Sequence, residues 1–319
     1  MLDDCLDPIS RDTLSAQNAA LTPDPLRVDP TSFAMHHSLT LEIERIDGLI
    51  GDMEPREQQR LWALRQNALW ARSRLDQAHE RLFAVYRRRI RENTLTPEAF
   101  RALLGIYATP ARQETWSDPP PYDDLDTLVD RLFSIDTPPP AQSPVEPEMV
   151  PYQATPVRIV LDMANRLALS PDDVFYDLGA GLGRVVFIMD LVSAGQMKGV
   201  EVERAYVEFA QGRARDLNLA QVTFINADAR AVDYADGTVF FLYTPFKRTI
   251  LRRVLTLLRA QAGTRPIRIC SYGPGTLEIQ DQDWLTSADD PDRDVHHVTI
   301  FESRRPSRSS TVRRWRRRM

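Results

Sequence analysis

Residues 174–203 read VFYDLGAGLGRVVFIMDLVSAGQMKGVEVE, and this stretch decides the fold. It opens with three strand-forming residues, and a glycine-rich turn follows at once. Residues 184–192 then have the apolar spacing of a helix that packs on a sheet, and residues 199–202 form a second short strand. This order predicts a parallel β-α-β unit with a ligand crevice at the carboxyl ends of its strands.

The residues around that crevice predict a nucleoside site. Glu201, 18 residues after Gly183, can accept both hydroxyls of a ribose. A dinucleotide site requires Gly-x-Gly-x-x-Gly, but here the third glycine comes one residue early. Asp177 precedes the glycines, and its carboxylate would repel a pyrophosphate but would suit a cationic aminoacyl group.

Asp-Leu-Gly-Ala-Gly-Leu-Gly followed by Gly-Val-Glu resembles the first two motifs of the class I S-adenosylmethionine-dependent methyltransferases. The resemblance covers about residues 150–303. It implies an α/β fold: a Rossmann-like seven-stranded sheet, mostly parallel with its last strand antiparallel, here preceded by an α-helical N-terminal domain. It also implies an enzyme with S-adenosylmethionine as cofactor. The alternative is an unliganded turn that merely needs its glycines.

The family pattern implies which residues hold the cofactor. Asp177 would face the aminoacyl end, Glu201 the ribose, and Asp228 the adenine amine at the end of a third strand. Tyr152 and Thr155 belong to a Tyr-x-x-Thr-Pro segment that folds over the cofactor in several protein-methylating relatives, although helix capping and packing would also explain them. The whole predicted set is Tyr152, Thr155, Asp177, Gly179, Ala180, Gly181, Gly183, Glu201, Asp228, Ala229 and Tyr243.

A fourth strand, residues 238–242, ends at Tyr243-Thr244-Pro245-Phe246, where this family presents the methyl group. Base and glutamine N-methyltransferases carry Asn/Asp-Pro-Pro-aromatic at this place. Tyr243-Thr244 replaces the acceptor half of that motif, which weakens the case for adenine or glutamine as substrate. The predicted catalytic residues are Tyr243, Thr244 and Phe246: two hydroxyls that orient a nitrogen or oxygen nucleophile, and a ring that walls the acceptor's entrance.

The run from the glycine turn to the fourth strand also resembles the non-SET histone-lysine methyltransferases and their bacterial protein-lysine relatives. A protein lysine is therefore one hypothesis for the acceptor, whose identity the sequence leaves open. A small-molecule methyltransferase and a non-catalytic binding protein that keeps the fold are the alternatives.

The chain divides into five predicted segments. They are a flexible arm (1–33), a helical domain (34–135), a proline-rich linker (136–151), the methyltransferase domain (152–303) and a basic tail (304–319). Apolar residues from Leu61 to Val85 recur at steps of three and four, which predicts either the core of the helical domain or a self-associating coiled coil.

Composition narrows the class of protein. The chain has 319 residues, 43% hydrophobic content and a net charge of −5. Two cysteines and no clustered Cys/His spacing predict no metal site and no disulfide framework, and no apolar run reaches the ~20 residues of a membrane helix. These features predict a cytoplasmic protein without membrane contact. The tail carries eight arginines and no acid, which predicts either contact with polyanions or a solubilising end.

Overall fold

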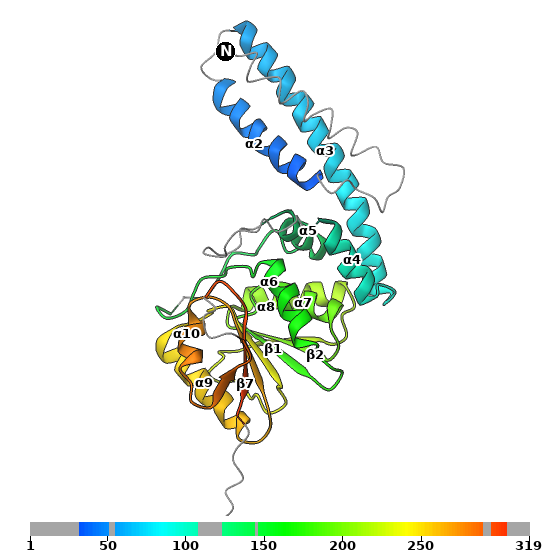
Figure 1. Ribbon diagram of the computed structural model, residues 1–319. Coiled ribbons are helices and arrows are strands. Elements are labelled where there is room, and N and C mark those ends of the chain that lie inside the picture. The colour runs from blue at the N-terminus through cyan, green and yellow to red at the C-terminus, as the bar shows by residue number, and fades with distance from the viewer. Residues whose placement is uncertain (1–31, 51–54, 108–122, 144–145, 290–294, 305–319) are drawn as a thin grey trace, which may run out of the picture.

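The computed structural model describes residues 32–50, 55–107, 123–143, 146–289 and 295–304 (Figure 1). The predicted basic tail lies outside these ranges except for Arg304, and so does the predicted arm except for Ser32 and Phe33, which begin the first described helix. The helices are α2 (Ser32–Ile50), α3 (Pro55–Arg91), α4 (Pro97–Tyr107), α5 (Asp124–Phe133), α6 (Val157–Leu167), α7 (Arg184–Val192), α8 (Arg204–Asp216), α9 (Arg248–Ala262) and α10 (Gly275–Gln280). The strands are β1 (Val174–Leu178), β2 (Gln196–Glu201), β3 (Val222–Asn226), β4 (Val239–Leu242), β5 (Arg268–Ser271), β6 (Leu285–Ser287) and β7 (Thr299–Ser303).

The seven strands form one sheet in the order β3-β2-β1-β4-β5-β7-β6. The central pairs are parallel, and β7 runs antiparallel to both of its neighbours. This confirms the predicted mostly parallel sheet with an antiparallel last strand. Strand order reverses direction at β1 and β4, and the carboxyl ends of these two strands are therefore where a ligand crevice opens.

Side-chain alternation along the strands divides the core between the two faces of the sheet. Phe175 and Phe241 join the core that α6, α7 and α8 cover. Tyr176 and Phe240, one residue away in each strand, point to the opposite face and pack with α9 and α10. The two faces follow from the period of two in a strand, and they sandwich the sheet between helices (Figure 1).

The N-terminal helices form an arm that joins the sheet domain through α4 and α5. Helices α2 and α3 pack as an antiparallel hairpin that projects away from the sheet, while α4 and α5 both contact α7 (Figure 1). The predicted stripe along α3 is buried at most of its positions, which include Leu61, Ala68, Leu75 and Leu82. Buried side chains from Phe33 to Phe133 belong to the same core cluster as the helices on that face of the sheet.

A buried ion cluster locks α5 to the start of α7. The guanidinium of Arg184, 3% exposed, donates to the Asp126 carboxylate at 2.6 Å, to the Asp130 carboxylate and to the Thr155 carbonyl at 3.0 Å. The Asp126 carboxylate also accepts from the backbone N–H of Val157 at 3.0 Å. Asp126 therefore satisfies an N–H group in the first turn of α6, a role that we expected of the Thr155 side chain. The glycine turn and the arm are thus coupled through one arginine.

No helix within the described ranges is both long enough and apolar enough to span a membrane.

Candidate active site

A crevice of about 510 Å³ opens at the carboxyl ends of β1, β2, β4 and β5. It is lined by most of the predicted site residues, namely Tyr152, Thr155, Asp177, Gly179, Glu201, Asp228, Ala229, Tyr243, Thr244 and Phe246. Predicted residues Ala180, Gly181 and Gly183 lie in the turn behind this lining. The predicted residues therefore converge from segments that are up to about 90 positions apart in the chain.

The glycine turn has positive φ angles of 90° at Gly179, 52° at Gly181 and 87° at Gly183. These are angles at which a residue with a Cβ is strained. A Cβ would also overlap protein side chains: that of Pro245 at Gly179 and the ring of Tyr152 at Gly181. The turn therefore requires glycine for packing inside the protein as well as for its backbone conformation.

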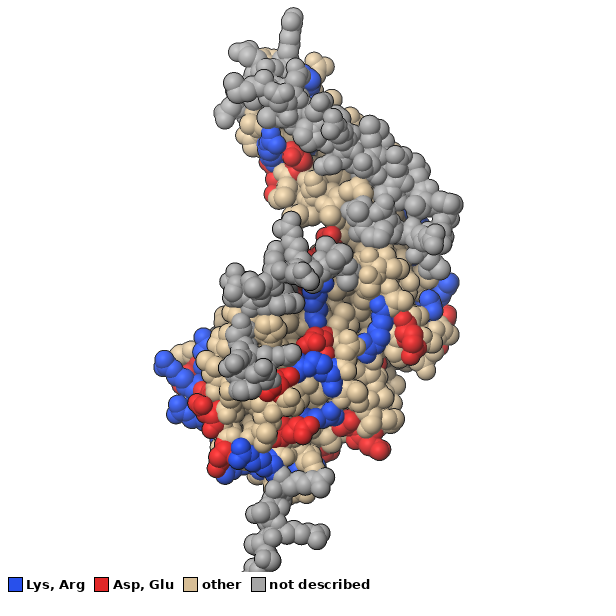
Figure 2. Space-filling model, in the orientation of Figure 1, with Lys and Arg blue, Asp and Glu red and all other residues tan. Residues whose placement is uncertain are grey.

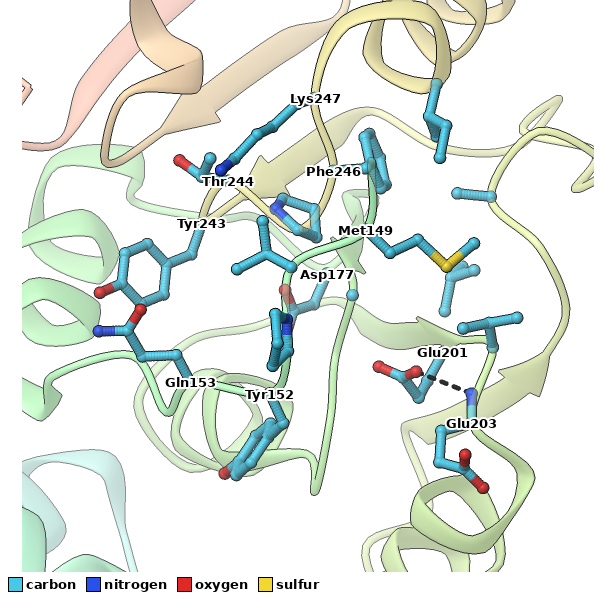
Figure 3. A pocket seen from close by; sticks show the side chains of 18 of the residues that line it. Met149, Tyr152, Gln153, Asp177, Glu201, Glu203, Tyr243, Thr244, Phe246 and Lys247 are labelled. Atoms are coloured by element: carbon cyan, nitrogen blue, oxygen red, sulfur yellow. Dashed lines mark hydrogen bonds between the residues drawn. The ribbon is translucent and has the colours of Figure 1, made fainter. Parts of the chain in front are cut away.

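Asp177 stands at the end of β1 with its carboxylate in the crevice (Figure 3). It is 4% exposed, and no hydrogen-bond donor in the described part of the chain reaches its side chain. Burial first, and then the nearby charge of Glu201, raise its pKa to about 8. A buried carboxyl group without a donor is a site that a cationic ligand would complete.

Glu201, at the end of β2, is held in place by the backbone. One oxygen accepts from the N–H of Gly181 at 2.9 Å. The other accepts from the N–H of Glu203 at 2.8 Å, the bond that is dashed in Figure 3. Burial raises its pKa, and these backbone bonds oppose that rise. Each oxygen retains a further lone pair, so a carboxylate fixed in this way can accept from two vicinal hydroxyls.

Residues 141–143 and 146–151, which we call the strap, run along the crevice and line part of it. Glu203 holds one end, because its Oε2 accepts from the N–H groups of Gln142 at 3.0 Å and Ser143 at 2.7 Å. Its Oε1 accepts from the N–H of Ala205 at 3.0 Å and caps α8. The segment predicted as a proline-rich linker thus contributes Ala141, Ser143, Met149, Val150 and Pro151 to the wall of the crevice.

The other end of the strap is bound to the turn after β4. The N–H of Val150 donates to the Pro245 carbonyl at 3.0 Å, and the N–H of Lys247 donates to the Glu148 carbonyl at 2.9 Å. The Glu148 carboxylate also accepts from the N–H of Thr249 at 2.8 Å, at the start of α9. Hydrogen bonds at both ends therefore connect the strap to the start of α8, just after β2, and to the segment between β4 and α9.

Asp228 lies at the edge of the crevice in a tight ion pair. Its carboxylate accepts from the backbone N–H of Arg230 at 2.7 Å and from the guanidinium of the same residue at 2.9 Å. These bonds hold its pKa below the ordinary value for an aspartate. The Arg230 guanidinium also donates to the Glu146 carboxylate in the strap at 2.7 Å. A series of ion pairs from Asp228 through Arg230 to Glu146 therefore borders this edge of the crevice.

The end of β4 divides the predicted catalytic residues between two sides of the crevice. Tyr243 points to the same side as Gln153 and Lys247, whereas Phe246 lies beside Met149 on the side of Glu201 (Figure 3). The Tyr243 ring lies 4.9 Å from the ring of Tyr272, centroid to centroid. Phe246 therefore lies apart from Tyr243, whereas the sequence-based prediction placed both residues at the entrance of the acceptor.

Thr244 has a φ angle of 41°, which is unfavourable for a β-branched residue. Its hydroxyl donates to the Tyr272 carbonyl at 3.2 Å and accepts from the N–H of Gly275 at 3.3 Å. These bonds join the turn after β4 to the turn after β5. They give the hydroxyl two backbone partners, whereas the sequence-based prediction aimed it at the acceptor.

A family model described as a methyltransferase domain matches residues 169–265, which run from before β1 to after α9. This range holds Asp177, the glycine turn, Glu201, Asp228 and the end of β4. Residues 169–265 therefore form a methyltransferase domain. No curated protein sequence matches the chain.

Several solved structures are similar to the methyltransferase domain. An RNA methyltransferase from Salinibacter ruber in complex with S-adenosyl-L-homocysteine is 25% identical, with 49% of this chain and 95% of that chain covered and a TM-score of 0.37. The putative methyltransferase yhhF from Escherichia coli is 19% identical, with 51% and 91% covered and a TM-score of 0.39. A precorrin-6y C5,15-methyltransferase from Geobacter metallireducens is 15% identical, with 50% and 93% covered and a TM-score of 0.37.

The residues of the crevice fit S-adenosylmethionine, the cofactor that the sequence predicts for this methyltransferase domain. The carboxyl group of Asp177 lacks a donor and is buried where a cationic aminoacyl group would supply one. Glu201 is oriented for ribose hydroxyls, and Phe246 with Met149 offers an apolar wall for a base. Within the described residues, no group of three or more His, Cys, Asp or Glu could hold a metal ion.

The sequence motifs did not reveal several residues of the crevice. Gln153 and Tyr206 lie next to predicted elements, whereas Tyr272 directly follows β5 and His296 lies in the turn before β7. The last strand begins at Thr299, so His296 precedes it by three residues. Tyr272 could have been found only from its position, because it directly follows β5, the strand that pairs with β4.

We predict that cofactor affinity depends on pH through Asp177. With a pKa of about 8, its carboxyl group is mostly protonated at pH 7 before the ligand binds. A cationic ligand favours the carboxylate, so binding releases a proton and affinity rises with pH. We expect up to about a tenfold gain per pH unit between pH 6 and 8, with little gain above pH 8 from this group.

Calorimetric titration with S-adenosylhomocysteine in buffers of different ionisation enthalpy measures the released proton directly. The Asp177→Asn variant should bind more weakly and should lose this proton release. A wild-type affinity that is flat from pH 6 to 8 would contradict the assignment of Asp177.

We also predict that Glu203 slows cofactor release, because its carboxylate holds the strap through two hydrogen bonds. Glu203→Ala removes two hydrogen bonds from a charged acceptor to the strap, and bonds of this kind are worth about 1.5–3 kcal/mol. We expect S-adenosylhomocysteine to dissociate about tenfold faster, as stopped-flow displacement would show. The matched control is Glu208→Ala on the exposed side of α8, and equal dissociation rates for the two variants would refute this role.

Proposed function

We propose that the protein is an active methyltransferase that methylates a lysine side chain of another protein. The observation that carries the proposal is the pair of tyrosine rings, Tyr243 and Tyr272, on the side of the crevice away from Glu201. A lysine has a flexible apolar stem that packs well on aromatic rings and an amine at its tip. The slot beside the two rings suits such an acceptor.

Several residues of the chain would prepare the amine. S-adenosylmethionine, when bound, supplies an electrophilic methyl group on its sulfonium. The amine must arrive neutral, because an ammonium has no lone pair. Enclosure beside Tyr243, whose own pKa is raised by burial, disfavours a charged group, and the nearby ammonium of Lys247 disfavours a second cation.

Gln153 supplies the amide that the Tyr243-Thr244 sequence lacks. Its side chain extends toward Tyr243 on the acceptor side of the crevice (Figure 3). Its amide oxygen can accept from a target amine while Tyr243 positions the stem. Orientation is the main contribution such residues make, and an error of ~1 Å can cost on the order of a hundredfold in rate.

We therefore expect Tyr243→Ala and Gln153→Ala to reduce turnover by about tenfold or more while affinity for S-adenosylhomocysteine stays within about twofold. Single-turnover kinetics and equilibrium binding on the same preparations would separate the two effects. Tyr234→Phe serves as the control, because that hydroxyl bonds to the Ala229 carbonyl outside the acceptor side. Loss of cofactor affinity in step with turnover would contradict the acceptor-side assignment.

The test of the proposed function is transfer of a labelled methyl group into a fractionated cell extract. Label in the protein fraction, recovered as methyl-lysine after hydrolysis, supports the proposal, whereas label in nucleic acid or in low-mass compounds overturns the acceptor class. A second candidate is a non-catalytic protein that binds the cofactor, which the engaged hydroxyl of Thr244 favours. That candidate predicts binding of S-adenosylhomocysteine without label in any fraction.

A further inference from the structure

Helix α3 presents an unusual outward face. Trp62 and Trp70 are 47% and 54% exposed, on the side of the helix opposite its buried stripe. Each indole carries an arginine, with Arg65 5.4 Å from the Trp62 ring centroid and Arg74 5.8 Å from that of Trp70. Two exposed indoles on one side of a helix give it an apolar surface that a partner can cover.

The same face carries positive charge at a regular interval. Arg74, Arg81 and Arg88 follow one another seven residues apart, and a helix places such residues about 10.5 Å apart along one face. None of the three forms an ion pair to a carboxylate in the described part of the chain. The whole helix has ten arginines against three carboxylates, in a protein whose net charge is −5.

We propose that this tryptophan–arginine face, made of Trp62, Trp70, Arg74, Arg81 and Arg88, is a docking surface for an acidic amphipathic helix of a partner protein. Acidic side chains seven residues apart on a partner helix have the same spacing as the three arginines. The indoles meet the apolar side of that helix. Tryptophan and arginine are the residue types that contribute most at protein interfaces.

The charge of the whole chain distinguishes this partner from a nucleic acid. Proteins that bind nucleic acid through a continuous field are usually basic over the domain, whereas this chain has a pI of about 5.6. Side chains of both signs are intermixed over the sheet domain on the face in Figure 2. An acidic helix needs only the local complement on α3 and not a basic surface around it.

The probe is a synthetic helical peptide of about four heptads, with glutamate at every seventh position and leucine beside it. Oxidative footprinting with mass spectrometry reports how accessible each tryptophan side chain of the full-length protein is. We expect the peptide to protect Trp62 and Trp70 by about threefold or more, and to bind at least tenfold more weakly to the Arg81→Glu/Arg88→Glu variant. A peptide with lysine in place of glutamate should give no protection.

The matched control is Arg215→Glu/Arg253→Glu, which makes the same change in net charge at exposed positions on α8 and α9. It should bind the peptide as the wild type does, and circular dichroism should show intact helix in both variants. The proposal is overturned if neither tryptophan is protected, if both double variants lose affinity equally, or if poly(U) protects the tryptophans more strongly than the peptide. The test involves no methyl transfer, so its outcome is independent of the proposed acceptor.

Discussion

Replacement of Arg184 by methionine should lower the free energy of unfolding by about 3–5 kcal/mol at pH 7. The arginine is 3% exposed and bonds to two carboxylates, those of Asp126 and Asp130, so its removal leaves their negative charge buried without a counterion. It also frees the Thr155 carbonyl, which the guanidinium contacts at 3.0 Å. Urea denaturation followed by circular dichroism would measure the loss.

The loss should shrink as pH falls. Burial raises the pKa values of Asp126 and Asp130 even with Arg184 present, and without the arginine they should rise further. When the pKa of a carboxyl group is higher in the folded state, the native protein binds more protons, so its relative stability improves below that pKa. The variant should therefore recover part of its deficit between pH 7 and pH 5.

Arg204→Met is the control, since that guanidinium pairs with Glu208 on the exposed surface, where solvent screens the pair and its loss should change stability little. If Arg184→Met cost no more than this control, the cluster would not couple the arm to the methyltransferase domain.

Replacement of Glu201 by alanine should weaken binding of S-adenosylhomocysteine about thirtyfold or more. A buried charged acceptor of ligand hydroxyls contributes about 2–5 kcal/mol when it is lost. Here the carboxylate is also preorganised by the N–H groups of Gly181 and Glu203, so little of its energy is spent on ordering. Equilibrium dialysis with labelled ligand would give the ratio of dissociation constants.

Glu201→Gln separates the two contributions of that residue. Its amide retains one oxygen for the glycine turn but loses an acceptor for the ribose, so its affinity should lie between those of wild type and Glu201→Ala. Glu208→Ala is the surface control. Equal affinity for wild type and Glu201→Ala would remove Glu201 from the cofactor site.

The strands of the sheet could be predicted because each strand, turn and helix pattern lies within a short contiguous stretch of the sequence. The stretch 174–203 contains both strands, the turn and the helix of one β-α-β unit. Four consecutive apolar residues, Val239 to Leu242, predict β4. Gly179 and Gly181 could be predicted as positive-φ positions, but not their contacts with Pro245 and Tyr152. Those contacts join residues more than 25 positions apart and exist only after the sheet has formed.

Fewer residues on the acceptor side of the crevice could be predicted from the sequence. Gln153 and Tyr272 carry no motif, and they meet Tyr243 only because β5 pairs with β4 and the strap runs along the crevice. The strap itself read as a stiff linker from its prolines, while its hydrogen bonds to Glu203 and Pro245 depend on distant backbone geometry. Composition thus predicted an extended segment but not what the segment covers.

Calorimetric titration of the full-length protein with S-adenosylhomocysteine and, separately, with NAD tests the central claim most directly. We predict that each chain binds one S-adenosylhomocysteine molecule in the crevice lined by Asp177, Glu201 and Phe246. NAD at the same concentration should give no heat of binding. Binding of NAD in place of S-adenosylhomocysteine, or of neither ligand, would contradict the account.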